Sequence, residues 1–101
     1  MKIAVTYQDG DIFQHFGHTE FFKIYDIENT DIVKTEIVST NGSGHGALAQ
    51  FLHEHSVDTL ICGGIGGGAQ MALSQAGIKL YGGVTGKADD AVNDLLNNKL
   101  N

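Results

Sequence analysis

Hydrophobic residues change their spacing about halfway along the chain. In the first half, β-prone runs cover residues 3–5, 20–27 and 32–40, and the last of them alternates polar with apolar positions. From residue 48 on, apolar side chains recur at i, i+3, i+4 and i+7 in three stretches, 48–55, 69–76 and 88–96. The short apolar runs 59–62 and 78–81 indicate buried parallel strands between these helices. The pattern therefore predicts an α/β protein of order β-β-β-α-β-α-β-α.

The predicted connections bring distant loops together. Right-handed crossovers make the last two strands parallel, and a meander makes the first strand parallel to the third. The carboxyl ends of four strands then share one edge of the sheet, which is where α/β proteins bind ligands. The segments expected at this edge are residues 8–19, 41–46, 63–66 and 82–86.

A glycine-rich turn is the most distinctive of these segments. Gly63, Gly64, Gly66, Gly67 and Gly68 place five glycines in six positions between an apolar run and a helical pattern. Such a turn lets another backbone or a ligand approach closely, and the following helix start offers free N–H groups to an anion. It is neither a P-loop nor a convincing dinucleotide fingerprint, because no Gly-Lys-Ser/Thr follows and no acidic residue stands at a strand end about 20 residues on. Close packing of helix and strand without any ligand is the alternative.

Three histidines fall at the same predicted edge. His15 and His18 flank Phe16-Gly17 in a loop longer than a hairpin needs, and His45 lies in the third-strand connection. Imidazoles at this spacing bind metals, although solvated loop histidines are the alternative. Cys62 is either a small buried hydrophobe or a fourth ligand, and no C-x2-C pair accompanies it.

Composition narrows the class of protein. The 101 residues form one domain, residues 1–101, with 42% hydrophobic residues for a modest core. The net charge of -6 argues against nucleic-acid binding. Apolar runs are far shorter than the roughly 20 residues that cross a bilayer, and no signal sequence is evident. The single cysteine agrees with a reducing compartment, so a cytoplasmic location is expected.

Catalytic constellations are scarce. The serines lack a nucleophile-elbow context, and the carboxylates Asp9 and Asp11 are typical of turns rather than of an acid-base pair. In the last predicted helix, Thr85 is expected as the N-cap, with Asp89 and Asp90 near the positive end of the helix dipole. A hydrolase is therefore disfavoured, and a non-enzymatic role is expected.

Several motifs together resemble a known family. The chain is similar to the dinitrogenase iron-molybdenum cofactor biosynthesis family in the residues that follow: Ile-Ala-Val-Thr at 3–6, His15-Phe16-Gly17, Gly44-His45-Gly46, Ile61-Cys62-Gly63-Gly64-Ile65-Gly66, Ala76-Gly77-Ile78 and Tyr81-Gly82. The resemblance implies a ribonuclease H-like fold with a mixed five-stranded sheet of order 3-2-1-4-5 and three helices. It also implies carriage of an iron-sulfur or molybdenum-containing cluster, and some relatives carry a molybdenum-copper-sulfide cluster. The histidine of the His-Phe-Gly motif, here His15, is the cofactor-associated residue in nitrogenase accessory members, and His18 stands where many members have arginine.

These observations predict a carrier that binds an anionic metal-sulfur cluster and no nucleotide. Cluster donor and acceptor proteins are the expected partners, and the chain is expected as a monomer or a weak homodimer that pairs through the exposed third strand. The alternatives are a small-molecule or phosphate-binding module at the same edge and a purely structural domain. The expected metal ligands are His15, His18 and His45. The expected cofactor-binding residues are His15, Phe16, Gly17, His18, His45, Gly63, Gly64, Gly66 and Gly67.

Overall fold

A mixed β-sheet forms the centre of the computed structural model, which describes residues 1–100 apart from the side chain of His45. The main strands are β1 (Lys2–Gln8), β3 (Phe21–Glu28), β4 (Asp31–Ser39), β5 (Thr59–Ile61) and β6 (Lys79–Tyr81). They lie in the order β4-β3-β1-β5-β6. β1 is antiparallel to β3, β3 is antiparallel to β4, and β1, β5 and β6 are mutually parallel. The predicted α/β class and strand order are therefore confirmed.

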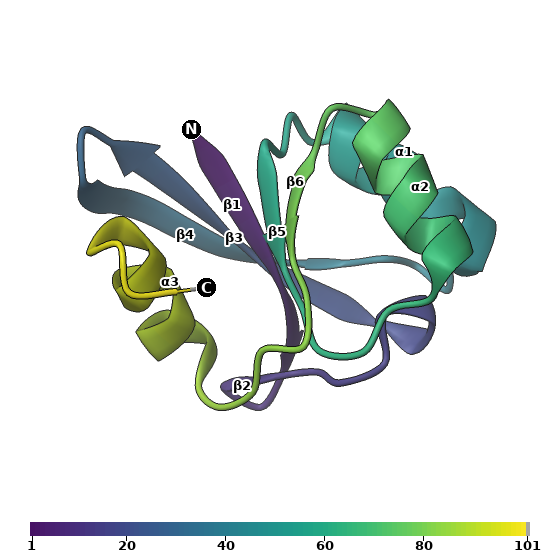
Figure 1. The fold of residues 1–101 in the computed structure, drawn as a ribbon, viewed down its shortest axis with the longest axis horizontal. Helices are drawn as coiled ribbons and strands as arrows, with labels where there is room; N and C mark the ends of the chain where they lie inside the picture. Colours follow the sequence, from purple (N-terminus) through teal and green to yellow (C-terminus); the bar gives the residue numbers. More distant parts are fainter. Residues whose placement is uncertain (101) are drawn as a thin grey trace.

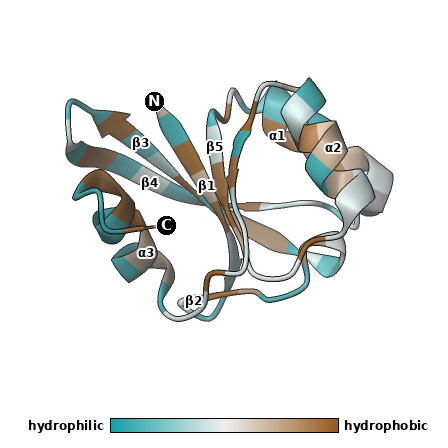
Figure 2. Cartoon of the chain, in the orientation of Figure 1, coloured by the Kyte–Doolittle hydropathy of each residue, from teal (hydrophilic) through white to brown (hydrophobic). Residues whose placement is uncertain are grey.

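Helices cover the two faces of the sheet unequally (Figure 1). Helices α1 (Leu48–Glu54) and α2 (Gly67–Gln75) lie together on one face, and α3 (Ala88–Leu96) lies on the other. Successive side chains of β1 point to opposite faces of the sheet and so contribute to both hydrophobic clusters. Ala4 packs in the cluster under α1 and α2, whereas Ile3 and Val5 pack in the cluster under α3. The hydrophobic colouring in Figure 2 follows this division, with apolar helix faces turned toward the sheet.

The long first connection contains structure that the sequence pattern did not predict. A two-residue strand, β2 (Asp11–Ile12), pairs with β1, and a 3-10 turn, η1 (Phe16–His18), follows it. A second 3-10 turn, η2 (His45–Ala47), leads into α1. The sheet consequently has six strands rather than five, although the order of the five long strands is unchanged.

Two further expectations are wrong. Thr85 does not cap α3, because Lys87 is the N-cap residue and its side chain makes no capping hydrogen bond. The chain between them instead pairs with β2, where the Ile12 N–H donates to the Gly86 carbonyl at 2.9 Å. β6 is also not a buried strand: it forms an edge of the sheet, and Lys79 is exposed. No helix within residues 1–100 is long and apolar enough to span a membrane.

Candidate functional site

The loop after β2 is anchored by one buried ring. Phe16 is 2% exposed, and its ring lies 6.4 Å from that of Phe22 on β3. The Thr19 hydroxyl donates to the Phe16 carbonyl at 2.7 Å, and the Thr40 hydroxyl donates to the Thr19 carbonyl at 3.0 Å. This chain of contacts ties η1 to the ends of β3 and β4. The exposed neighbour His15 is thereby held at the surface on a fixed turn.

The glycine turn after β5 pairs directly with this loop. The Gly64 N–H donates to the Gln14 carbonyl at 2.7 Å, and the Phe16 N–H donates to the Gly64 carbonyl at 3.0 Å. His15 and Gly64 form a parallel bridge as a result. A Cβ on Gly63 would lie 2.6 Å from the Gln14 Cα, a separation that real Cβ atoms do not show. The absence of a side chain therefore permits this pairing.

Gln14 is a contributor that sequence reasoning missed. Its side-chain amide donates to the carbonyl of Ile12 at 3.0 Å and to that of Val84 at 3.1 Å, so it links the first loop to the connection after β6. Nothing in the local sequence distinguishes this glutamine from a solvated one, because both acceptors belong to segments brought near it by folding.

A cleft of about 570 Å³ opens between the first loop, η2 and the start of α2. Among the described residues, His15 is its one charged or titratable lining residue, and no carboxylate or lysine side chain of that part lines it. The His15 ring packs edge-on against Phe13, with ring centroids 6.0 Å apart. The lining residues are His15, Phe16, Gly17, Gly46, Gly64, Ile65, Gly66, Gly68, Ala69 and Ala72.

The start of α2 faces this cleft without a side-chain cap. Gly66 is the N-cap residue and makes no side-chain capping hydrogen bond, and a Cβ at Gly66, Gly67 or Gly68 would meet nothing within 4 Å. The first turn of a helix has unpaired N–H groups and the positive end of the helix dipole. The wall formed by Gly66, Gly68 and Ala69 thus offers donors and positive potential to a bound anion.

Some of the residues predicted to bind the cofactor line the cleft, and others do not. His15, Phe16, Gly17, Gly64 and Gly66 line one cleft. Gly63 is buried beneath it, and Gly67 begins α2 without lining it.

Of the other two predicted histidines, His18 lies close by in the chain but is not among those lining residues. His18 is exposed at the end of η1, where its N–H donates to the His15 carbonyl at 2.9 Å. The backbone of His45 starts η2 next to the cleft-lining Gly46, while its side chain lies outside the described part.

Cys62 belongs to the core. It is fully buried, and burial raises the pKa of its thiol to about 11, so the thiol is protonated at neutral pH. A protonated, inaccessible thiol is a poor metal ligand. Among the side chains that the structure describes, no three His, Cys, Asp or Glu residues are grouped to hold a metal ion.

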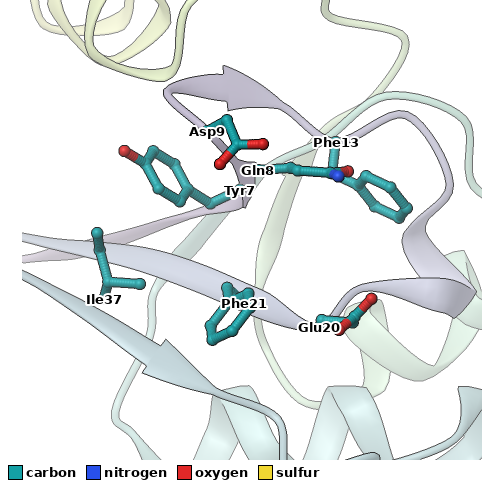
Figure 3. Close-up of a pocket in the computed structure, with 7 residues that line it drawn as sticks. All are labelled: Tyr7, Gln8, Asp9, Phe13, Glu20, Phe21 and Ile37. Atoms are coloured by element: carbon teal, nitrogen blue, oxygen red, sulfur yellow. The ribbon is translucent and has the colours of Figure 1, made fainter.

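A second hollow of about 400 Å³ lies next to the β1–β2 turn (Figure 3). Its described lining combines apolar and aromatic side chains with the carboxylates of Asp9 and Glu20 and includes no imidazole. Two carboxylates would repel an anionic cluster. The histidine-lined cleft is therefore the better candidate for such a cargo.

The geometry defines a small α/β protein with a cleft lined by histidine and glycine at the carboxyl edge of its sheet. Residues 1–98 match the dinitrogenase iron-molybdenum cofactor family, and the chain belongs to that family.

Individual relatives cover almost the entire chain. An uncharacterised protein of Methanocaldococcus jannaschii is 31% identical over an alignment 105 residues long. The alignment covers 99% of this chain and 89% of the relative. The crystal structure of PH0822 superposes with a TM-score of 0.94 at 29% identity and covers 100% of this chain and 93% of that one. The apo form of the orange protein from Desulfovibrio gigas superposes with a TM-score of 0.86 at 27% identity. This match covers 99% of this chain and 90% of the orange protein chain.

Proposed function

We propose that this protein binds and carries a preassembled iron-sulfur or molybdenum-containing cluster in the cleft beside His15, without catalysing a reaction. The observation that carries the proposal is the juxtaposition of one imidazole with the uncapped start of α2 in a cleft whose described lining contains no carboxylate. Sulfide-rich clusters are anionic, and helix starts and free amides attract anions. Membership of a family named for the iron-molybdenum cofactor supports the same cargo class.

His15 is the proposed metal ligand. It is exposed, it lines the cleft, and its backbone is fixed by the bridge to Gly64. His18 and His45 are proposed as helpers because each lies within a few residues of the lining. Few protein ligands suit a carrier, since the cargo must leave again for an acceptor protein.

One feature of the cleft supports a non-catalytic role. Among the side chains that the structure describes, the cleft lining has no second acid, base or nucleophile to work with His15. A carrier instead requires partners that load and unload it, so we propose a cluster donor and a cluster acceptor in the cytoplasm, where a cluster and the single cysteine stay reduced.

The test is cluster uptake by the anaerobically purified protein. Titration with tetrathiomolybdate, and separately with iron and sulfide, should produce visible absorption bands that saturate. His15→Ala should weaken uptake by at least about tenfold, because it removes a metal ligand. The matched control is His53→Ala, which removes an exposed histidine from α1. Equal uptake by His15→Ala and the unsubstituted protein would refute the assigned role of His15.

The pH dependence separates ligation from simple attraction. A protonated imidazole cannot ligate a metal, so affinity should fall between about pH 7.5 and 5.5 if His15 coordinates the cluster. If the imidazole only attracts the anion, its protonation should instead tighten binding over the same interval.

The alternative function is a phosphate or small-molecule binding module. The uncapped start of α2 favours this second candidate because backbone amides bind phosphate as readily as they bind sulfide clusters. Such a module would bind inorganic phosphate without colour and without dependence on His15. Isothermal titration with phosphate, repeated on His15→Ala, distinguishes the two functions.

A further inference from the structure

The outer edge of β4 has unpaired backbone groups. Within residues 1–100, β4 pairs with β3 alone. The Thr40 N–H donates to the Glu20 carbonyl at 2.9 Å, so the even-numbered residues of β4 after its bulge direct their backbone groups toward β3. The Ile27 N–H donates to Met1 on the β1 side at 2.8 Å, which agrees with this alternation. Thr35, Ile37 and Ser39 therefore direct their N–H and carbonyl groups outward.

The side chains of this strand are also exposed on both faces. Val33 is 53% exposed and Ile37 is 54% exposed, although both are large and apolar. Ile37 lies beside Phe21, which is 42% exposed, at the rim of the second hollow (Figure 3). Exposed strand edges with apolar side chains are sites where another strand adds.

The sequence of β4 is complementary to itself in one antiparallel register. When two copies are paired about Thr35, Lys34 of each lies opposite the partner's Glu36, so the register contains two pairs of opposite charge. In the same register Val33 lies opposite the partner's Ile37, and Ile32 lies opposite the partner's Val38. Residues directly opposite in an antiparallel pair project from the same face, so these side chains meet.

Neighbouring registers lack this match. A pairing centred on Lys34 or on Glu36 places like charges directly opposite each other. A pairing centred on Ile37 places Glu36 opposite the partner's Val38. Of the four registers compared, only the one centred on Thr35 places opposite charges opposite each other and apolar side chains opposite apolar side chains. This register also uses the outward backbone groups of Thr35 and Ile37.

We propose that two copies of this chain associate through antiparallel pairing of their β4 edges, centred on Thr35, to form one continuous sheet. A single strand pair is a small interface, so the association is weak and depends on protein concentration. The surface lies at the β4 end of the sheet, whereas the candidate cleft joins η1 to the start of α2. Dimerisation is therefore independent of the proposed cargo, and its test needs no cluster.

Sedimentation velocity from micromolar to millimolar protein tests the proposal. The unsubstituted chain should shift from monomer to dimer over this range. Lys34→Glu and Glu36→Lys should each raise the dissociation constant by roughly tenfold, because each replaces two attractive pairs with two repulsive ones. The double variant Lys34→Glu/Glu36→Lys should return the dissociation constant to near its original value. Glu54→Lys makes the same charge change at an exposed position of α1 and should leave the dissociation constant unchanged.

Mixing the two single variants provides the sharpest test. A Lys34→Glu chain and a Glu36→Lys chain are complementary at both charged positions. The mixture should therefore form a heterodimer more tightly than either variant forms a homodimer. Both positions are exposed, and matching circular dichroism melts will show that the variants remain folded. A chain that stays monomeric at millimolar concentration, a dimer insensitive to both reversals, or a mixture that forms no heterodimer overturns the proposal.

Discussion

Gly63 and Gly67 stand four residues apart in one turn, yet an added methyl group would meet different surroundings at each. At Gly63 it would lie 2.6 Å from the Gln14 Cα, whereas at Gly67 it would meet nothing within 4 Å. The requirement at Gly63 is for space, because neither residue has a positive φ. Glycine content alone therefore does not show which positions of the turn are essential.

Paired substitutions check this difference. Gly63→Ala should lower the free energy of unfolding by about 2 kcal/mol, because the backbone of Gln14 must move. Gly67→Ala should leave it unchanged or raise it by up to about 1 kcal/mol, because alanine is favoured over glycine in a helix. Urea unfolding of the two variants provides the measurement, and equal destabilisation would contradict the assignment.

At the scale of elements, one carboxylate of α3 adds polar contacts with the sheet to the apolar packing of that helix. Asp89 Oδ1 accepts from the Tyr25 hydroxyl at 2.6 Å and lies 2.9 Å from Lys23 Nζ. The hydrogen bonds from Tyr25 and Lys23 lower the pKa of Asp89. Burial, followed by the bond to Asp89, raises the pKa of Tyr25 well above its usual value of 10.0. Both shifts stabilise the folded chain near neutral pH.

Asp89 and Tyr25 are expected to limit the stability of the fold at opposite ends of the pH range. Because the pKa of Asp89 is lower in the folded state, its stabilising effect is present above pH 3.8 and lost as the pH falls below that value. Because the pKa of Tyr25 is raised, its contribution is present below pH 10.0 and declines as the pH rises further. Stability should therefore fall at both extremes.

Tyr25→Phe isolates the alkaline limb. The variant should lose about 1 kcal/mol of stability at neutral pH, since it removes a buried hydrogen bond. Its stability should also decline less steeply than that of the unsubstituted chain above pH 10.0. Urea titrations at a series of pH values measure both effects.

At the scale of the whole molecule, the cleft depends on packing between segments far apart in sequence. Phe16 joins the core beside Phe22, and the turn after β5 fixes the neighbouring backbone. The proposed cargo binding is therefore expected to be coupled to folding through Phe16, which is buried, but not through His15, which is exposed.

Two substitutions at adjacent residues should separate these roles. Phe16→Ala should lower the free energy of unfolding by about 3 kcal/mol, because it leaves a cavity in the core, and it should weaken cluster uptake as well. His15→Ala should weaken uptake with a change in stability of less than about 0.5 kcal/mol. Thermal unfolding and visible titration of both variants test the separation, and a large stability loss in His15→Ala would contradict it.

Periodicity predicted the long elements well because their burial repeats every two or every 3.6 residues. Residues 20–27, 48–55 and 88–96 were expected in elements that the structure places at Phe21–Glu28, Leu48–Glu54 and Ala88–Leu96. The two-residue strand β2 has no period to detect, and Thr85 has a capping side chain but lies in a segment that pairs elsewhere. Cleft-lining residues such as Ile65 and Ala72 carry no chemical signal of their own.

The sequence by itself determined the α/β class and the convergence of His15 with the glycine turn, because local periodicity and chain connectivity are sufficient for these, whereas the strand order was implied by the resemblance to a known family. Only the tertiary structure decided that Gly63 receives the backbone of Gln14 while Gly66 and Gly68 line open space. It likewise decided that Cys62 is a buried thiol and that Thr35, Ile37 and Ser39 are the residues of β4 whose backbone groups point outward. These properties depend on distances between residues that are far apart in the chain, and no local pattern encodes such distances.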